Sequence, residues 1–343
     1  MSLCGDLMAE SYKCPTRADV ARLAGVSVTV VSYVINNNRY VDKLKRERVE
    51  AAIRELNYRP NSIARVLKGK NSNHIVFIAD EISNEHFSFL VSEMEQHAYK
   101  RGYIISLCRN RNTAEFVSEI ISRQYDGIVI SSISITEAFV KKFLAAQIPV
   151  VLLVNRDYSE MENTGRIDTG LYLGARECVR HLISRGHRNI LYLDRFSEHG
   201  NFSTLQDLRL RGFTEQMQES SLSFSEQNII TGCHNEEEVA RKIRERIQGG
   251  FKADAIFGRN DRLACIGMQA VQHLGYCVPK DISVIGFDNS RLSQYTMPTL
   301  STVEMQRREI GHAAIDMIHQ MVETKTIPQP MYFSTRLIVR EST

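Results

Sequence analysis

Residues 17–36 read RADVARLAGVSVTVVSYVIN, and this stretch decides the fold of the amino-terminal part of the chain. Its first half places apolar side chains at helical spacing and stops at Gly25, which tolerates the positive φ that a tight turn needs. Ser27 can cap a second helix, because a serine hydroxyl accepts a hydrogen bond from a backbone N–H in the first turn. The pattern predicts two short helices joined by a tight turn.

The second predicted helix has an unusual outer face. Val28, Thr29 and Tyr33 lie opposite the apolar stripe that includes Val31. A helix in the major groove of DNA can use methyl groups against thymine and hydroxyls against bases or phosphates. A third amphipathic helix over 43–57 can close a small core. Together these features favour a helix-turn-helix unit over the alternative, an ordinary helical hairpin inside a larger core.

Positive charge is concentrated in the same part of the chain. Through residue 70 there are thirteen Lys and Arg against seven Asp and Glu, a balance of +6, whereas the whole chain has a net charge of only +3. The remainder therefore carries −3. Such a distribution favours phosphate contacts by the first seventy residues.

A second basic element, NYRPNSIARVLKGK, occupies residues 57–70. Arg59-Pro60 is expected to end the preceding helix, and Asn61 can cap the next one. Residues 62–68 make only one or two turns, fewer than an isolated helix of about 12–15 residues needs to persist in water. We therefore expect this segment to be disordered when the protein is free.

The rest of the chain alternates apolar strands with amphipathic helices. With 43% hydrophobic and 24% charged residues, its composition is typical of a globular protein with a large core. Uninterrupted apolar strands between helices indicate parallel sheets covered on both faces, and there are too many for one sheet. We therefore predict two doubly wound α/β subdomains. The strands are expected within 75–79, 103–108, 127–131, 150–154, 189–194, 228–231, 254–258 and 283–287.

Several other classes of protein are disfavoured. The chain has no run of eighteen apolar residues, and its first residues, MSLCGDLMAESYK, are polar rather than an export signal. Its seven cysteines have no CxxC spacing, which favours a reducing cytoplasm and argues against a zinc finger or other metal site. No phosphate loop, GxSxG elbow or HExxH pair suggests an enzyme. The basic amino-terminal unit argues against an exported sugar-binding protein.

Seven motifs in this order resemble the lactose/galactose repressor (LacI/GalR) family of bacterial transcription regulators. They are DVARLAGVS (19–27), VSYVIN (31–36), ELNYRPN (55–61), IARVLK (63–68), GHRNI (186–190), GFDN (286–289) and VREST (339–343). The resemblance implies a homodimer that binds a palindromic DNA operator and a small-molecule effector, in the cytoplasm, near the nucleoid, with no cofactor and no membrane. It also implies a sensor domain that resembles periplasmic binding proteins.

The resemblance implies a division into four parts. These are a tail (1–15), a helix-turn-helix domain (16–60), a hinge helix and linker (61–73), and an effector-binding and dimerisation domain (74–343). Within the last, the chain is expected to cross between subdomains near 163–169, 299–303 and 328–330. The N-subdomain would then hold 74–165 and 301–328, and the C-subdomain 166–300 and 329–343.

The resemblance also assigns DNA-binding roles. Leu67 matches a residue that enters the minor groove, with Ala64 allowing close approach and Arg65 near the backbone. Val30 and Tyr33 depart from the common pattern, in which threonine and arginine or histidine are frequent. Because tyrosine lacks the fork with which arginine reads guanine, the operator sequence stays open. The candidate DNA-binding residues are Thr16, Ser27, Val28, Thr29, Ser32, Tyr33, Asn36, Asn61, Ala64, Arg65 and Leu67.

Candidate effector-binding residues follow from the rule that open α/β sheets bind ligands at the carboxyl ends of their strands. The family pattern adds Arg209 as a ligand-gripping arginine, with Asp288 as the facing carboxylate. The candidates are Ser83, Asn84, Phe87, Ser132, Arg156, Arg209, Asn260, Asp261 and Asp288. Three departures adjoin this site: Asp80 stands where proline is usual, Glu85-His86 replaces Pro-Phe, and an Asp-Asn pair is displaced to Asp168 or lost.

These expectations predict a repressor that releases its operator when a sugar or sugar derivative binds. The alternative is a regulator that needs a co-repressor and senses a nucleobase or another metabolite. Since VREST ends the sequence without a heptad repeat, we expect no tetramer built on a carboxy-terminal coiled coil.

Overall fold

The computed structural model describes residues 15–59, 71–82, 85–158 and 161–343. The chain forms two compact units that divide between Ser72 and Asn73. We call the first unit the head and the second the sensor domain.

The head contains the three predicted helices, α1 (Arg17–Ala24), α2 (Val28–Asn36) and α3 (Lys43–Glu55). Thr16 and Asp19 form a capping box at the start of α1, and Gly25 ends this helix in the left-handed region, with φ of +62°. Small side chains let the three helices approach closely around one core. That core contains Val20, Ala21, Ala24, Val31, Val34, Val49, Ala52 and Tyr58.

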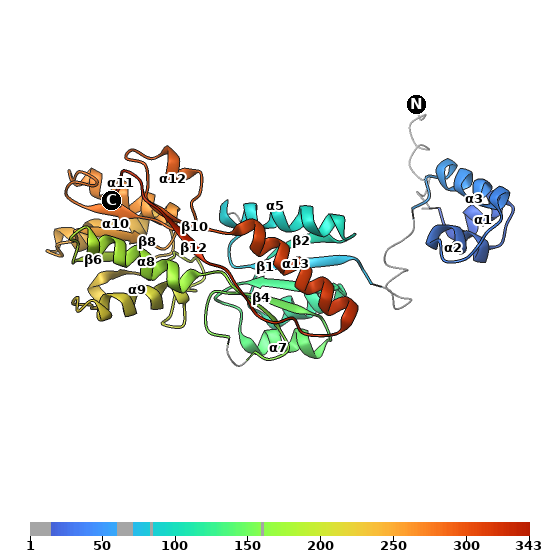
Figure 1. Ribbon diagram of the computed structural model, residues 1–343, viewed down its shortest axis with the longest axis horizontal. Helices are drawn as coiled ribbons and strands as arrows, with labels where there is room; N and C mark the ends of the chain where they lie inside the picture. Colours follow the sequence, from blue (N-terminus) through green and yellow to red (C-terminus); the bar gives the residue numbers. More distant parts are fainter. Residues whose placement is uncertain (1–14, 60–70, 83–84, 159–160) are drawn as a thin grey trace, which may run out of the picture. The chain divides into compact units, whose positions relative to one another are not determined.

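The sensor domain begins with a six-stranded sheet that belongs to the N-subdomain (Figure 1). Its strands are all parallel, in the order β11-β5-β4-β3-β1-β2. The bounds are β1 (His74–Ala79), β2 (Ile104–Arg109), β3 (Gly127–Ser131), β4 (Val150–Val154), β5 (Gly165–Asp168) and β11 (Met331–Tyr332). Helices cover both faces: α5 (Glu85–Lys100), α6 (Ala114–Ser122), α7 (Glu137–Ala145) and α13 (Arg307–Thr324).

Strand β1 shows how the covered sheet follows from the apolar run. Ile75 and Phe77 pack into the core beneath α5 and α13, whereas Val76 and Ile78 pack into the core beneath α6 and α7. Successive side chains of a strand point to opposite faces, so a strand between two helical layers must be apolar throughout.

The C-subdomain has a four-stranded parallel sheet in the order β7-β6-β8-β9. Its strands are β6 (Ile190–Leu193), β7 (Ile229–Ile230), β8 (Ala255–Gly258) and β9 (Ser283–Ile285). Its helices are α8 (Leu171–Ser184), α9 (Leu208–Glu219), η1 (Glu226–Asn228), α10 (Glu236–Gln248), α11 (Asp261–His273) and α12 (Leu292–Tyr295). The doubly wound α/β architecture predicted from the sequence is confirmed.

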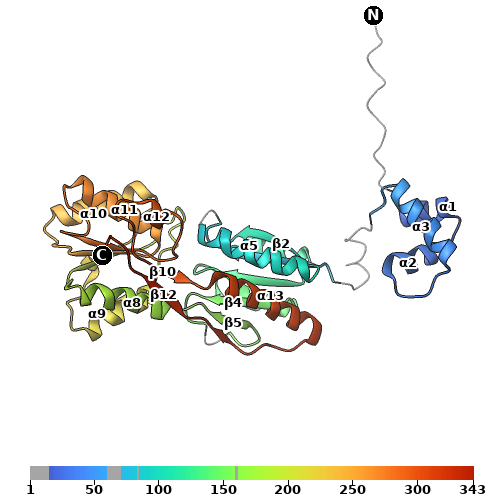
Figure 2. The ribbon, with the colours of Figure 1, turned by 45° about the horizontal axis from the view of Figure 1, so that its top comes forward.

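Three connections join the two subdomains (Figure 2). The chain leaves the N-subdomain after β5, returns along β10 (Thr302–Met305), and leaves again along β12 (Thr335–Ile338), which pairs antiparallel with β10. The sequence-based boundaries differ from these strands by a few residues. Residues 166–168 and 331–332 were expected in the C-subdomain, but hydrogen bonding between β5 and β11 places them in the N-subdomain sheet.

Within the ranges that the structure describes, no single helix is both long and apolar enough to cross a membrane. Helices α1 and α2 reach those limits only as a pair, bent by 105°.

Candidate functional site

Helix α2 presents one face to the head core and the other to solvent. Val31 and Val34 are buried, whereas Val28, Thr29 and Asn36 are exposed. The Ser27 hydroxyl accepts a hydrogen bond from the backbone N–H of Val30, at 3.3 Å, which confirms the predicted cap. The free face of α2 therefore carries methyl and hydroxyl groups at the start of a capped helix.

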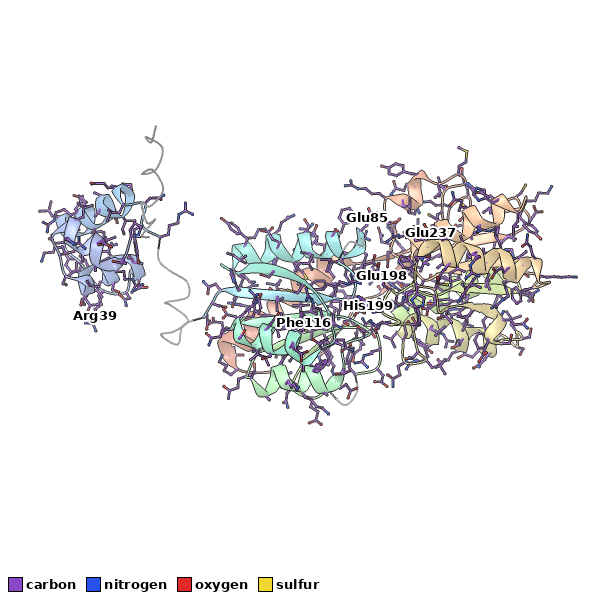
Figure 3. All side chains as sticks on the ribbon, turned by 180° about the vertical axis from the view of Figure 1, so that it is seen from behind. Arg39, Glu85, Phe116, Glu198, His199 and Glu237 are labelled. Carbon is purple, nitrogen blue, oxygen red and sulfur yellow. The ribbon has the colours of Figure 1, made fainter. Side chains whose placement is uncertain are left out.

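Two arginines extend this face of α2. Arg17 donates a hydrogen bond through Nη1 to the Ser32 hydroxyl, at 3.1 Å. Arg39 donates to the Tyr33 hydroxyl at 3.3 Å, and its guanidinium lies 5.2 Å from the centre of the Tyr33 ring. Arg39, labelled in Figure 3, thus supplies a guanidinium beside a position where tyrosine replaces the usual cation. The predicted hinge residues Asn61, Ala64, Arg65 and Leu67 lie outside the described residues.

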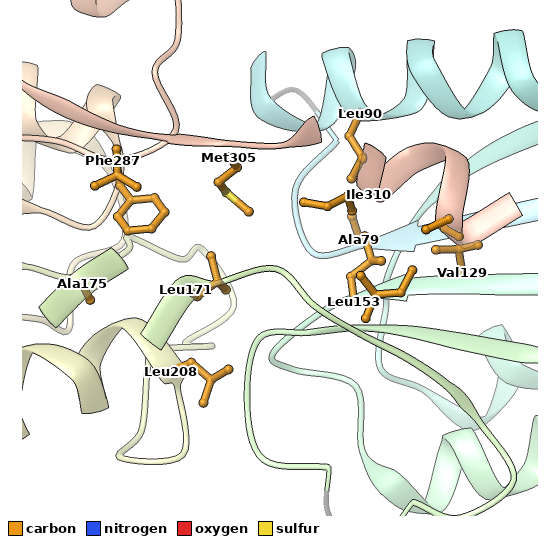
Figure 4. Packing of buried hydrophobic residues seen from close by; sticks show 14 of the residues in the cluster. Ala79, Leu90, Val129, Leu153, Leu171, Ala175, Leu208, Phe287, Met305 and Ile310 are labelled. Carbon is orange, nitrogen blue, oxygen red and sulfur yellow. The ribbon is translucent and has the colours of Figure 1, made fainter. Parts of the chain in front are cut away.

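The sensor domain contains a cavity of about 100 Å³ between its two subdomains. Apolar side chains from both subdomains contribute to its walls, with Leu90, Leu153 and Ile310 on the N-subdomain side and Leu171 on the C-subdomain side (Figure 4). Its polar lining residues are Asp80, Glu81, His86, Ser131, Asn155, Thr169, Arg195, Arg209, Arg259, Asn260 and Asp288. The cavity lies at the carboxyl ends of the strands, as the rule for α/β sheets predicts.

Arg209 and Asp288 form an ion pair inside the C-subdomain wall. Arg209 Nη2 lies 2.8 Å from Asp288 Oδ1, and the guanidinium stacks 4.4 Å from the centre of the Phe287 ring. Arg209 reaches this position because Asp207 caps the first turn of α9. Arg209 Nε is buried, and none of the described residues accepts a hydrogen bond from it. The pair presents donors and an acceptor side by side.

Arg259 forms a second buried ion pair in the same wall. Its Nη1 lies 2.7 Å from Asp207 Oδ1 and donates to the Ser203 hydroxyl at 3.0 Å. Burial alone would raise the pKa of the Asp207 carboxyl, but Arg259 lowers it below the usual value. Both groups therefore stay charged at neutral pH.

His86 lies on the N-subdomain side, with Nδ1 4.0 Å from Asp288 Oδ1. Burial lowers the pKa of His86 to about 4; Asp288 opposes this shift, whereas Arg209 and Arg307 reinforce it. The imidazole is neutral at pH 7. It therefore faces Asp288 as a neutral polar group rather than as a cation.

Asp261 begins α11 behind the cavity and accepts hydrogen bonds from Ser290 and Thr302. Burial, and next the nearby charge of Asp288, raise its pKa to about 7, although the hydrogen bonds from Thr302 and Ser290 lower it. Asp261 does not line this cavity but lies beside it, in a second groove to which Asp288 also contributes.

The structure brings part of the predicted effector set together. Phe87, Arg209, Asn260 and Asp288 line the cavity. Ser132 is fully buried and donates to Asp80 instead, and Arg156 points elsewhere, donating to the carbonyl of Ile135 and stacking on Tyr158. These two residues, like Asp261, support the walls rather than line them. Ser83 and Asn84 lie outside the described residues.

Two arginines of the cavity were missed in the sequence. Arg195 follows β6 by two residues, and Arg259 directly follows β8. The strand-end rule, applied to these two strands as it was to the others, would have found both. Among the described residues, no group of three or more potential ligands could hold a metal ion.

Comparison with known proteins assigns both units. Residues 16–61 match the model of bacterial regulatory proteins of the lacI family, and residues 179–343 match a periplasmic binding protein-like domain. The HTH-type transcriptional repressor PurR of Photobacterium profundum is 30% identical over 332 residues, covering 95% of this chain and 98% of its own. PurR of Vibrio parahaemolyticus is 32% identical over 318 residues, covering 90% and 92%.

Solved structures agree with these sequence matches. The Lac repressor dimer bound to operator and the anti-inducer ONPF has a TM-score of 0.82, with 25% identity and coverage of 96% of this chain and 99% of that one. The complex of the transcriptional regulator CelR with cellobiose has a TM-score of 0.70 at 22% identity, covering 96% of this chain and all of that chain. The fold and the head define a DNA-binding transcription regulator. The chain belongs to the lacI family of bacterial regulatory proteins, whose members are repressors rather than enzymes.

Proposed function

We propose that this repressor binds a palindromic operator as a homodimer in the cytoplasm, and that a nucleobase in its cleft changes the affinity for DNA. The observation that carries the proposal is the joint presence of a capped recognition helix with a free outer face and a polar cavity between two subdomains. A two-fold symmetric dimer would place two such helices on the half-sites of a palindrome.

The cavity favours a small, flat effector. Its volume of about 100 Å³ is well below the 300–1,000 Å³ of sites for larger ligands. Phe87 offers a ring face, and Arg209 and Asp288 present donors and an acceptor on one edge. A nucleobase carries matching acceptors and donors along its edge. Arg209 Nε, buried without an acceptor among the described residues, could then bond a ring nitrogen or carbonyl.

The relatives also bear on the choice between a nucleobase and a sugar as the effector. Repressors named PurR are among the curated proteins that cover nearly the whole chain, at 30–32% identity. The cellobiose and ribose complexes among the solved structures share only 20–22% identity with this chain, so they support its fold but not its effector. We therefore favour the nucleobase over the sugar that the family resemblance first suggested.

Thermal unfolding of the full chain with adenine, guanine, hypoxanthine, uracil, ribose, glucose and cellobiose tests the effector. A base should raise the unfolding temperature, since a ligand that binds only the folded state stabilises it. Gel shifts on a palindrome selected from random DNA then test the operator. Weaker binding with the base would indicate induction, and stronger binding co-repression.

Two results would overturn separate parts of the proposal. Stabilisation by a sugar but by no base would refute the effector class and leave DNA binding intact. Failure to prefer any selected duplex over random DNA would refute the operator.

A further inference from the structure

Asp80 and Arg195 form an ion pair that joins the two subdomains. Asp80 directly follows β1 of the N-subdomain, and Arg195 lies two residues beyond β6 of the C-subdomain. Arg195 Nη1 is 3.1 Å from Asp80 Oδ2, and both side chains line the cavity. The side chains are 18% and 11% exposed, so water screens this pair far less than it screens a surface pair. The two groups touch directly, and their contact needs no bridging molecule.

The N-subdomain holds the Asp80 carboxylate in a fixed position. The hydroxyls of Ser132 and Ser134 donate to Oδ1, and the backbone N–H of Ile133 donates to Oδ2 at 2.8 Å. Burial by itself would raise the pKa of Asp80, but Arg195 and these three hydrogen bonds lower it below the usual value. Asp80 is therefore a charged and oriented acceptor for Arg195.

The other buried ion pairs of the cavity cannot serve this purpose. Arg209 with Asp288 and Arg259 with Asp207 each lie wholly within the C-subdomain. They shape one wall, but they place no constraint on the opposite wall. Among the described residues that line the cavity, Asp80 and Arg195 are the two oppositely charged side chains that pair across it, since His86 faces Asp288 as a neutral group.

Apart from the contact of the neutral His86 imidazole with Asp288, the other contacts between charged side chains across the junction are more exposed. Arg262 lies 3.2 Å from Glu81, with side chains 47% and 38% exposed, and Arg109 lies 3.9 Å from Glu198, labelled in Figure 3. Exposed pairs contribute little, because solvent and salt screen them. They provide natural controls for the buried pair.

We propose that Asp80 and Arg195 are a closing pair, which holds the two subdomains of the sensor against each other and so sets how readily the cleft opens for an effector. Breaking the pair shifts the equilibrium towards the open form. An effector shifts the equilibrium between the open and closed forms only if it binds one form more tightly than the other. The pair sets where this equilibrium lies without effector, and so how far the effector can change DNA binding. The pair acts within the sensor, whatever the effector or operator.

Two backbone amides report on closure without touching the pair. The N–H of Leu208, in the C-subdomain, donates to the carbonyl of Asn155 in the N-subdomain at 3.0 Å. The N–H of Arg291, also in the C-subdomain, donates to Glu85 Oε1 of the N-subdomain at 2.9 Å. Separation of the subdomains frees both amides for exchange with solvent.

Hydrogen–deuterium exchange of the full chain, with no ligand added, tests the proposal. In Arg195→Met, exchange at Leu208 and Arg291 should be about tenfold faster than in the unmodified protein, because the closed form loses a partly buried, charge-assisted hydrogen bond. Arg262→Met, which breaks the exposed pair with Glu81, should change it by less than about twofold. Unchanged exchange at Val239 and Ile243, on the buried face of α10, shows that each variant is folded.

A double variant distinguishes loss of the interaction between the two side chains from independent structural damage at each position. Asp80→Asn should also speed exchange at the two reporters, and adding Arg195→Met to it should add little, because one interaction is already lost. Additive effects of the two substitutions would overturn the proposal. It would also fail if Arg195→Met left both reporters unchanged, or if faster exchange were confined to the residues next to position 195.

Discussion

The candidate sites of the head and of the sensor cleft differ in how far apart their residues lie in the sequence. In the head, the exposed candidates Val28, Thr29 and Asn36 belong to one nine-residue helix, which is held by caps and a core within the same forty residues. In the cleft, Asp80, Arg195, Arg209 and Asp288 come from four strand or helix ends separated by up to 208 positions in the chain. Local sequence therefore specifies the first site, and only the fold assembles the second.

The two sites also differ in whether their polar side chains are already paired within the protein. Thr29 and Asn36 are exposed on α2 and accessible to a partner. In the cleft, Arg209, Arg259 and Arg195 each hold a carboxylate. DNA can thus add contacts to the head, whereas an effector must exchange partners that the protein has already paired. Operator binding by the head should therefore be sensitive to substitutions in its core. Effector binding in the cleft should be sensitive to substitutions of its charged residues.

The largest effect is expected from Val31→Asp in the head. Val31 is fully buried, and a carboxylate in so small a core would cost about 4 kcal/mol or more, enough to unfold the head. Operator binding in a gel shift should be lost, while thermal unfolding of the sensor domain is unchanged. Leu44→Asn, at an exposed position of α3, is the matched control and should keep binding. Normal operator binding by Val31→Asp would contradict the assigned core.

Arg209→Met should impair effector binding in the cleft without changing operator binding by the head. Loss of a charged hydrogen-bonding group should weaken effector binding by about 3 kcal/mol, or roughly a hundredfold, with operator affinity unchanged. Calorimetric titration and gel shifts measure the two. Arg211→Met is the control: it lies two residues further along α9, stacks on Tyr172, and does not line the cavity. Equal loss of both activities in Arg209→Met would break the proposed separation.

Asp261 predicts a pH effect confined to the sensor. Its pKa is about 7 in the folded protein against 3.8 ordinarily, so the folded state binds the proton more tightly. The free energy of unfolding therefore falls as pH rises from about 4 to about 7. Asp261→Asn removes this loss, and its stability relative to the unmodified protein should rise by roughly 2–3 kcal/mol from pH 5 to pH 8.

Urea unfolding at pH 5, 6, 7 and 8 measures the effect of Asp261→Asn. Glu237→Gln, on the exposed face of α10, should follow the curve of the unmodified protein. Parallel curves for Asp261→Asn and the unmodified protein would show that Asp261 does not titrate in this range.

The smallest expected effect tests how far the head depends on local bonds. Thr16→Ala removes the capping box with Asp19 and should lower the stability of the head by about 1 kcal/mol. Thermal unfolding of the head measures the loss. Thr16→Ser keeps the hydroxyl and should restore most of it, whereas equal destabilisation by both substitutions would assign the role to the threonine methyl group.

Sequence reasoning placed the head helices and caps correctly because the signals lie within a few residues of one another. It also placed the strands of both sheets that are long apolar runs. It missed β5, β10 and β12, which each carry a charged side chain, and β11, which has only two residues, both exposed. Their pairing partners lie far along the chain, so no local pattern marks them.

The candidate site was predictable in position but not in its pairings. The strand-end rule pointed to the cleft and to Asp288, and the family pattern added Arg209 with Asp288 as the carboxylate that faces it; the two side chains form a pair. The neighbour of Asp80, however, is 115 residues away, and nothing in the sequence indicates that Arg195 meets it. The sequence shows that Asp80 stands where proline is usual. What Asp80 contacts is evident only in the folded structure, where the ends of β1 and β6 lie on opposite sides of the cavity.

The three crossings between subdomains have a consequence for synthesis on the ribosome. Helix α13 covers one face of the N-subdomain sheet, and β11 completes its edge, yet both come from the last 37 residues of the chain. A nascent chain that has already made β1 to β5 covers that face with α5 alone while the whole C-subdomain is translated. The amino-terminal half of the sensor is thus the part most exposed to aggregation during biogenesis, and the natural client for a chaperone.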